Sequence, residues 1–181
     1  MSQYIIELPF IKWKKQELFN YMNSYPLNRW RHEHDRLYPD LTYINKYLRV
    51  DPTVLLDNIY SQIPELQLST EFTFFAELGP RVLLAPHRDA GRNAVINFPI
   101  YGDWAKTPVR FHNSLAMTKA SVVHEHCYNE AHPSILNVGE IHSAYNITNE
   151  TRYILSMSVH LPWNEIKDIV ARYNYIVPGS T

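Results

Sequence analysis

The sequence contains one cysteine, Cys127, among 181 residues. A single thiol excludes a framework of intrachain disulfides, and no apolar run approaches the roughly 20 residues that a membrane-spanning helix needs. The N-terminus also lacks the succession of basic, apolar and small residues that marks a secretory signal peptide. These absences predict a cytoplasmic protein with no membrane partner.

The chain has no excess of charge of either sign, since 17 lysines and arginines stand against 18 aspartates and glutamates. A net charge of -1 leaves no excess of positive charge that would bind the phosphate backbone of a nucleic acid. A neutral ligand, or an anionic one held by a few arginines, fits this balance better. Only five glycines are present, and the sequence shows no repeat or low-complexity stretch, so we expect a globular chain.

What the chain has instead is a long series of strand-like segments. Short runs rich in β-branched and aromatic residues follow one another, separated by turn residues. Helical patterns lie at the two ends of this series and not between its members, which favours a β-sandwich or rolled barrel over a parallel α/β sheet. About eight strands are predicted, at residues 66–78, 81–86, 93–100, 109–112, 121–127, 135–138, 142–147 and 152–160.

The segments before and after this series of strands contain shorter patterns, which predict one edge strand and three helices. Residues 3–13 include Pro9 and suit an edge strand or an extended lead-in. Asp51 is placed as the N-cap of a helix, with Pro52 at its first position. Apolar residues at helical spacing predict three helices, at residues 14–22, 51–64 and 164–173.

The polar segment 27–40 surrounds Trp30 with arginine, histidine and acidic residues. It predicts an irregular loop, whose function, if it has one, would be that of a lid or a substrate contact anchored by Trp30. We expect the whole chain, 1–181, to form one domain. Its expected parts are a helical and irregular N-terminal support at 1–64, a β core at 65–160, and a C-terminal helix and tail at 161–181.

One pair of residues is a candidate for metal binding. Of the nine histidines, only His87 has an acid, Asp89, two positions after it. Residues two apart on an extended segment point to the same side, so both could bind one metal ion if a third ligand arrives from elsewhere. Two histidines and a carboxylate on one face of a metal leave its other face open for substrate and dioxygen, as in non-heme Fe(II) oxygenases.

Three later histidines could supply the third ligand. His124 and His126 share one face of a strand, where lining a pocket or making half-buried hydrogen bonds is the better interpretation. His142 follows a strand and a Gly-Glu turn, which favours it as the third ligand. The other pair two apart, His32 and His34, lies in a charge-dense run that indicates a solvated face.

Arg152 lies ten residues beyond His142. The series His87-x-Asp89, then His142, then Arg152, within a strand-rich chain, resembles the Fe(II)- and 2-oxoglutarate-dependent oxygenases of the double-stranded β-helix (jelly-roll, cupin-like) fold. The resemblance covers about residues 72–160 and leaves both terminal helical parts unmatched.

Within that family, one branch looks closest in detail. Leu136-Asn137 before His142, and Asn146 after it, are similar to the aspartyl/asparaginyl β-hydroxylase-like branch. That branch often lacks the acid ligand, so Asp89 departs from it toward the general family.

The resemblance implies a role for each matching residue. His87, Asp89 and His142 would be the iron ligands. Arg152 would bind the distal carboxylate of the cosubstrate 2-oxoglutarate, since two guanidinium N–H groups can donate to one carboxylate. A polar residue at Asn97 would also touch 2-oxoglutarate, although a hydrogen bond to a neighbouring strand explains Asn97 equally well.

One position departs from the family pattern. The family often has a hydroxyl residue two positions after this arginine, and here that position holds Ile154. Ser156 or a tyrosine would have to supply the hydroxyl contact with 2-oxoglutarate. Arg92 could hold an anionic substrate or face solvent, and Arg88, between the two ligands, is expected to point outward.

The predicted fold is therefore mainly β with flanking helices and a double-stranded β-helix core. The predicted function is that of an Fe(II)- and 2-oxoglutarate-dependent dioxygenase that hydroxylates a C–H bond of an amino-acid side chain, a peptide or a small metabolite. Its partners would be 2-oxoglutarate, O₂ and that substrate. Trp30, Tyr101 and Trp104 could line an aromatic substrate entrance, although aromatic residues are also common in protein cores.

Other interpretations of the same residues stay open from the sequence. A non-oxidative cupin-like metalloenzyme would use the metal only as a Lewis acid and would not need Arg152 in its pocket. A non-catalytic β-barrel module would bind a metal or ligand without chemistry. In a β-sandwich without any site, His87 and His142 would simply be hydrogen-bonded polar residues.

Overall fold

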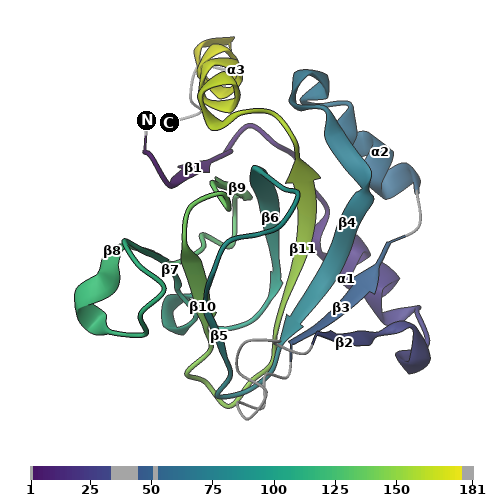
Figure 1. Ribbon diagram of the computed structural model, residues 1–181. Helices are drawn as coiled ribbons and strands as arrows, with labels where there is room; N and C mark the ends of the chain where they lie inside the picture. Colours follow the sequence, from purple (N-terminus) through teal and green to yellow (C-terminus); the bar gives the residue numbers. More distant parts are fainter. Residues whose placement is uncertain (1, 34–44, 51–52, 177–181) are drawn as a thin grey trace.

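Two antiparallel β-sheets face each other in the computed structural model, which describes residues 2–33, 45–50 and 53–176 (Figure 1). The larger sheet has the order β1-β9-β6-β11-β4-β3-β2, and the smaller has the order β5-β10-β7-β8. The larger sheet consists of β1 (Ile5–Glu7), β2 (Arg31–Glu33), β3 (Asn45–Arg49), β4 (Leu68–Leu78), β6 (Ala94–Tyr101), β9 (Ser134–Leu136) and β11 (Arg152–Val159). The smaller consists of β5 (Leu83–His87), β7 (Val109–His112), β8 (Val122–His126) and β10 (His142–Tyr145).

From β4 onward the chain crosses repeatedly between the two sheets. β4 belongs to the larger sheet, β5 to the smaller, β6 to the larger, and β7 and β8 to the smaller. The remaining strands alternate again, so most neighbours within a sheet are distant in sequence, as in a jelly roll. Each of the eight predicted strands is present, and the prediction of a mainly β fold with flanking helices is confirmed.

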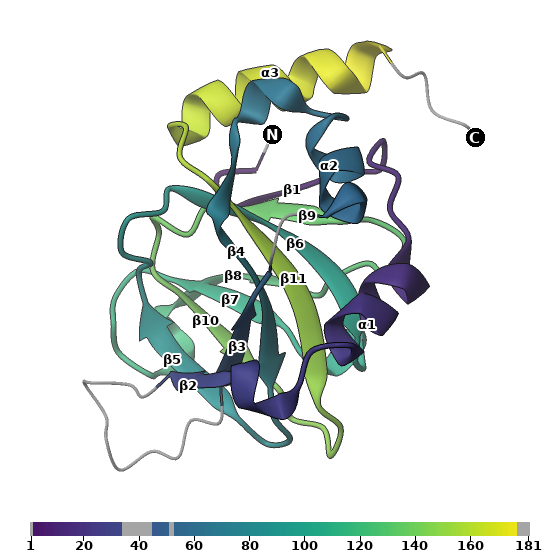
Figure 2. The same cartoon turned by 90° about the vertical axis from the view of Figure 1, so that its right-hand side faces the viewer.

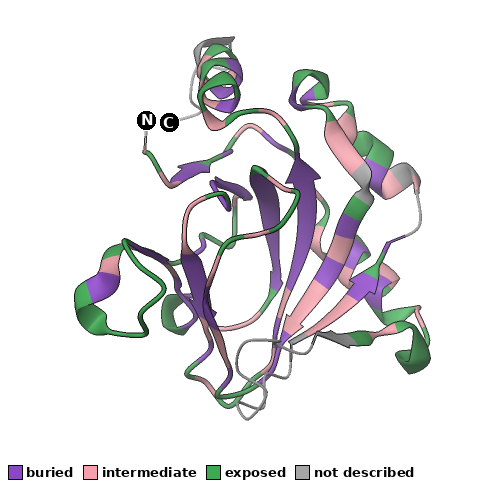
Figure 3. Cartoon of the chain, viewed as in Figure 1, coloured by how far each residue is buried: buried purple, intermediate pink, exposed green. Residues whose placement is uncertain are grey.

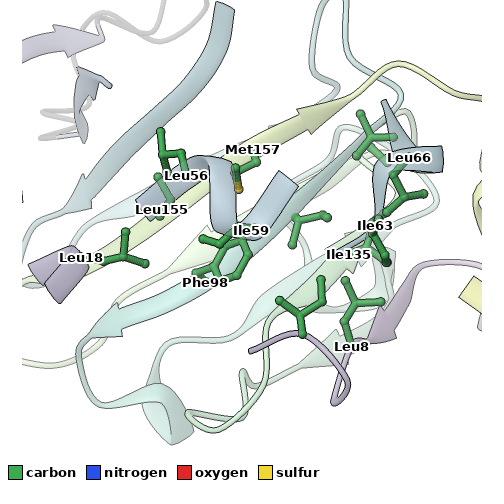
Figure 4. Close-up of a cluster of buried hydrophobic side chains, with 14 of the residues drawn as sticks. Leu8, Leu18, Leu56, Ile59, Ile63, Leu66, Phe98, Ile135, Leu155 and Met157 are labelled. Carbon is green, nitrogen blue, oxygen red and sulfur yellow. The ribbon is translucent and has the colours of Figure 1, made fainter. Parts of the chain in front are cut away.

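Helices cover the outer face of the larger sheet (Figure 2). Their apolar stripes pack on alternate residues of the sheet, such as Phe98 and Leu155, in one large buried cluster (Figure 4). Burying each such side chain contributes roughly 1.5–3 kcal/mol, so this face serves stability. No helix in the described part of the chain is long and apolar enough to cross a membrane. The helices are α1 (Lys15–Asn23), α2 (Val54–Tyr60) and α3 (Trp163–Ile176), with short 3₁₀ turns at Leu27–Arg29, Pro64–Leu66, Trp104–Lys106 and Lys119–Ser121.

The inner face of the larger sheet is different, because side chains alternate along each strand. On β11, Leu155 and Met157 point toward the helices, whereas Arg152 and Ile154 contact the residues between the two sheets. The strands that border this space are mostly buried (Figure 3). A second apolar cluster fills part of it, formed by Ile5, Val95, Trp104, Val109, Phe111, Tyr128, Leu136, Val138 and Ile154.

The N-terminal part contributes more to the sheet than predicted. Residues 31–33, expected within an irregular loop, form β2, which pairs with β3, and β3 pairs with β4. Both strands are short and mostly polar, so their own sequence carries little hydrophobic pattern. Pairing with β4 places β3, and pairing with β3 places β2 at the sheet edge. Residues 34–40 of the predicted loop, with His34, lie outside the described residues. β1 lies at the other edge, as predicted for an edge strand.

The second helix begins later than predicted. Thr53 is the N-cap of α2, and its side chain accepts a hydrogen bond from the Leu56 N–H at 3.4 Å. Threonine and aspartate both cap helices well, so the sequence alone did not distinguish between the two positions. The predicted cap, Asp51, and Pro52 after it lie outside the described residues.

Candidate active site

His87, Asp89 and His142 come together where the smaller sheet meets the loop after β5. His87 is the last residue of β5 and lies directly opposite His142, the first residue of β10, in the antiparallel register. The Asp89 Oδ1 atom lies 3.4 Å from the His87 Nε2 atom and 3.9 Å from the His142 Nε2 atom. The potential ligand atoms of the three residues all lie within 4.8 Å of one another. This geometry suits three ligands of one metal ion.

Backbone carbonyls orient both imidazole rings. The His87 Nδ1 atom lies 2.7 Å from the Ala85 carbonyl oxygen, and the His142 Nδ1 atom lies 3.0 Å from the Glu140 carbonyl oxygen. Because a carbonyl oxygen only accepts, each Nδ1 carries the proton and donates it. Nε2 is then the ring nitrogen left to bind a metal, and in both histidines it faces Asp89.

The charges at this cluster also suit a divalent cation. Burial by itself would raise the pKa of the Asp89 carboxyl, but its hydrogen bond with His87 and the positive charge of Arg92 outweigh burial and bring the pKa to about 2. Burial, together with charge on His87, lowers the pKa of His142 to about 4. At neutral pH Asp89 is therefore a carboxylate and His142 a neutral imidazole, and carboxylate and imidazole ligands suit Fe(II) and other first-row divalent metals.

Arg92 holds the carboxylate from its other side. Its Nη2 atom lies 2.5 Å from Asp89 Oδ2, and its guanidinium stacks over the Phe74 ring at 5.0 Å. Oδ2 is thereby occupied, and Oδ1 is left facing the two imidazoles. Arg88, between the two predicted ligands, is exposed, as expected from strand alternation.

Arg152 is a buried cation on the inner face of β11. Its side chain donates from Nη1 to the Thr107 carbonyl oxygen at 3.0 Å, and its guanidinium lies 5.7 Å from the ring centres of Trp104 and Tyr128. Burial lowers the pKa of Arg152. No aspartate or glutamate among the described residues forms an ion pair with it. A buried charge without a counter-ion is costly, so an anion from outside the chain would stabilise this guanidinium.

Gly102 makes room for Arg152. A Cβ atom at this glycine would lie 3.2 Å from the Arg152 Cγ atom and 3.3 Å from its Cα atom. The φ angle of Gly102 is +144°, which side-chain-bearing residues rarely adopt. The turn after β6 can therefore approach the arginine only because it contains glycine.

Asn97 faces the same interior space. Its Nδ2 atom donates to the Tyr128 hydroxyl at 2.7 Å, and its Oδ1 atom is buried without a hydrogen-bond partner among the described residues. Asn97 thus bonds a side chain across the interior and not a neighbouring strand. The prediction from sequence missed Tyr128, although the alternation that places His124 and His126 on one face continues to residue 128.

The predicted aromatic entrance is wrong for two of its three residues. Trp30 packs against Tyr153 and Tyr101 packs against Phe19, on the helix-covered side of the larger sheet. The reason is alternation on β11, where Tyr153 points away from the side that Arg152 faces. Trp30 helps to line a separate cavity of about 250 Å³ on that outer side.

The third predicted entrance residue, Trp104, does lie between the sheets. It is 3% exposed, and its ring contacts both Arg152 and Tyr128. It therefore forms part of the wall around the buried arginine and not a mouth open to solvent. Ser156, one of the residues predicted to supply the hydroxyl contact that Ile154 lacks, is buried on the same face of β11, opposite Asn97 on β6.

No protein-family model matches the sequence, and no curated protein is significantly similar to it. Solved structures are similar in three dimensions. A prolyl hydroxylase from Trichoplax adhaerens, in complex with a peptide fragment of the hypoxia inducible factor oxygen degradation domain, has a TM-score of 0.63 at 9% identity, over 93% of this chain and 86% of that one. A prolyl-4-hydroxylase from Pseudomonas putida has a TM-score of 0.58 at 12% identity, over 86% of this chain and 91% of that one.

A third structure is a 2OG-Fe(II) oxygenase family protein from Burkholderia pseudomallei, with a TM-score of 0.50 at 8% identity, over 85% of this chain and 82% of that one. The chain has the double-stranded β-helix fold. The prediction of this core is thereby confirmed. At such low identities the likeness shows the fold alone, and the function has to be argued from the site.

Proposed function

We propose that this protein is an Fe(II)- and 2-oxoglutarate-dependent dioxygenase that hydroxylates a C–H bond of an amino-acid side chain, a peptide or a small metabolite. The observation that carries the proposal is the buried guanidinium of Arg152, which has no acidic partner among the described residues and lies in the same fold as a three-residue metal cluster. A metal used only as a Lewis acid would not need this cation, whereas a dicarboxylate cosubstrate would.

In this proposal His87, Asp89 and His142 hold Fe(II) through two imidazole nitrogens and one carboxylate oxygen. Fe(II) and 2-oxoglutarate, when bound, supply the activation of O₂ and the oxidative decarboxylation that yields succinate and CO₂. The protein contributes position and charge. The carbonyls of Ala85 and Glu140 fix the two rings, so the ligands are oriented before the metal arrives.

Arg152 binds the distal carboxylate of 2-oxoglutarate through the N–H groups that Thr107 does not use. Tyr128 accepts a hydrogen bond from Asn97 and its ring lies beside Arg152, so its hydroxyl can supply the contact with 2-oxoglutarate that Ile154 cannot. Apolar neighbours such as Phe111 and Ile154 keep water from this space, which strengthens the charge pairing within it.

The comparisons support the oxygenase class, because the similar structures are named as prolyl hydroxylases and a 2OG-Fe(II) oxygenase family protein. One of them holds a peptide fragment, which supports a peptide among the candidate substrates. The likeness to the aspartyl/asparaginyl β-hydroxylase-like branch stays a prediction. Asn146, one of its markers, donates to the carbonyls of Leu78, Gly79 and Glu150, which is a structural role at the start of β11.

The direct test is conversion of 2-oxoglutarate to succinate by the purified protein in the presence of Fe(II) and O₂. We expect succinate to form only when all three are present, and to increase when a substrate is found among amino acids, peptides and metabolites. Calorimetry under anaerobic conditions measures whether 2-oxoglutarate binds to the Fe(II)-loaded protein. A protein that binds Fe(II) but neither binds nor consumes 2-oxoglutarate would contradict the proposal and favour the non-oxidative alternative.

Replacement of Arg92 tests how the metal site is supported. Arg92→Gln removes the charge that holds Asp89 Oδ2, so the carboxylate is freer to rotate and its pKa rises. Loss of a group that orients a metal ligand typically costs 10–100-fold in affinity, and we expect about that loss for Fe(II), measured by competition with a chelator.

The neighbouring Arg88→Gln is the matched control, since Arg88 is exposed and makes no ion pair among the described side chains. Arg92→Lys, which keeps the charge, should recover part of the lost affinity. Equal Fe(II) affinities for the Arg92→Gln and Arg88→Gln proteins would show that Arg92 does not support the site.

A further inference from the structure

The space between the sheets contains more unpaired polar groups than 2-oxoglutarate would occupy at Arg152. Among the described residues, seven buried side-chain atoms lack a hydrogen-bond partner, and five of them border this space. Each such atom costs about 1–3 kcal/mol if it stays unpaired. Their concentration in one region therefore indicates a bound polar molecule. The five are Asn97 Oδ1, Trp104 Nε1, His124 Nε2, His126 Nε2 and Ser134 Oγ.

Two of these groups lie beside the metal cluster in a defined register. His142 on β10 pairs with Phe111 on β7, and Phe111 pairs with His124 on β8. His124 is thus in the same row across the smaller sheet as His142, two strands away, or about 10 Å at the usual strand spacing. His126 lies one step further along β8, on the same face.

Both rings are fixed by aromatic contacts that leave the buried nitrogen free. His124 stacks on Tyr4 at 5.4 Å, and His126 meets Tyr128 edge to face at 5.5 Å. The outward positions of β8 are used differently, since Glu125 forms an exposed ion pair with Arg110 at 2.6 Å. The two histidines therefore have their orientation set by packing while their Nε2 atoms lack any partner within the described structure.

The facing sheet supplies complementary groups. Ser134 on β9 lies opposite Asn97 on β6, and both present a buried, unpaired oxygen. The Asn97 oxygen can only accept, whereas the serine hydroxyl and an imidazole nitrogen can each donate or accept. The Trp104 Nε1–H, in contrast, can only donate. A ligand that satisfies all of these groups must therefore offer both a donor and an acceptor.

The acid that acts on His126 disfavours an anion at this ring, whereas the cation Arg152 lies against Trp104 and Tyr128. Burial lowers the pKa of His126, so this ring is neutral at neutral pH, and the acid that acts on it is Glu7. Glu7 lies opposite Ser134 in the β1–β9 register. An incoming carboxylate would thus meet a negative charge and an acceptor-only oxygen, whereas a neutral amide, with its N–H and C=O side by side, would satisfy both kinds of group.

We infer that His124, His126 and Ser134 bind an amide group of the primary substrate, so that the substrate is a peptide or an amide-bearing amino acid. The inference rests on the proposed function, because it places this group beside the metal cluster of an oxygenase. The oxidised carbon lies within reach of His87, Asp89 and His142, and the amide is held about two strand spacings from it.

The test uses acetamide as the probe and acetate, which has nearly the same size and carries a negative charge, as its comparison. Protein labelled with ¹⁵N-histidine is first loaded with Zn(II), a diamagnetic substitute for Fe(II), and with 2-oxoglutarate, and both binding steps are followed. Acetamide should then shift the ring-nitrogen signals of His124 and His126 in a saturable manner, while acetate leaves them in place.

Ring-preserving variants identify the nitrogen atoms responsible. His124→Phe and His126→Phe keep the contacts with Tyr4 and Tyr128 and remove only the nitrogens, and Ser134→Ala removes the hydroxyl. Each should weaken acetamide binding relative to 2-oxoglutarate binding by about two- to tenfold, the value of one hydrogen bond. His160→Phe, at an exposed position after β11, is the control and should keep the wild-type acetamide affinity.

Two results would overturn the inference. If neither probe shifts either ring, no hydrogen-bonding ligand site exists there. If acetate shifts the rings as strongly as acetamide, the ligand is a carboxylate and the assignment to an amide is wrong. Failure to load Zn(II) or 2-oxoglutarate would be a different result, since it would count against the proposed function itself.

Discussion

Replacing any one of His87, Asp89 and His142 by alanine is expected to abolish stoichiometric Fe(II) binding and, with it, succinate formation. The three side chains supply the ligand atoms that lie within 4.8 Å of one another, so loss of one leaves a two-ligand site. Removing a ligand should cost more than removing a group that supports one, so we expect Fe(II) affinity to fall by more than about 100-fold. Metal analysis after anaerobic dialysis, and chelator competition, measure the loss.

The control for these variants is His160→Ala, because His160 is exposed after the end of β11. Thermal unfolding distinguishes loss of a ligand from loss of the fold. His142 is buried against Phe111, so its variant could lose packing, whereas His87 is only partly buried and gives the cleaner measurement. Full Fe(II) binding and turnover by the His87→Ala and Asp89→Ala proteins would eliminate the proposed metal site.

Replacing Arg152 by methionine should remove 2-oxoglutarate binding while leaving the metal ligands in place. The variant keeps the length of the side chain and removes the charge that Thr107 orients. Truncating one partner of a buried charge pair costs about 2–5 kcal/mol, which corresponds to a roughly thirtyfold to several-thousandfold weaker affinity. Calorimetry with the anaerobic Fe(II) protein measures this affinity. In thermal unfolding, 2-oxoglutarate should raise the Tm of the wild type but not that of the variant.

Arg110→Met is the matched control, since Arg110 pairs with Glu125 on the exposed side of the smaller sheet and such pairs contribute little. Arg152→Lys tests geometry separately from charge, because lysine cannot donate two parallel bonds to one carboxylate. If Arg152→Met protein bound 2-oxoglutarate as the wild type does, or kept its activity, a non-oxidative metalloenzyme would become the better interpretation.

Much of the fold could be predicted from sequence because it depends on local patterns. Strands were placed correctly from residue 66 to residue 160, where β-branched and aromatic residues alternate between turns. Strands β2 and β3 were missed, since they are short and mostly polar and depend on pairing, β3 with β4 and the edge strand β2 with β3. The helix cap was placed two residues early, at Asp51, because Thr53 meets the same local requirement.

The candidate site likewise contains residues that could be predicted from the sequence and residues that could not. His87 and Asp89 are two apart on one extended segment, so spacing could name them as a pair. The strand and turn before His142 favoured it as the third ligand, and the resemblance to the oxygenase family gave Arg152 its expected role. Tyr128 was not named, although it contacts Arg152 and accepts from Asn97. Trp30 and Tyr101 were named wrongly as an entrance. Which sheet face a residue joins depends on register with partners far away in the chain, and composition does not show register.

The sequence by itself determined the strand-rich class, the helices at both ends, and the pair His87 and Asp89, because each of these follows from spacing along one segment. Only the tertiary structure decided that His87 lies opposite His142, that Arg92 holds Asp89, and that His124 shares their row. The physical reason is the crossing of the chain between two sheets. That crossing brings residues more than 50 positions apart within 4 Å and leaves Arg152 buried without an acid partner among the described residues.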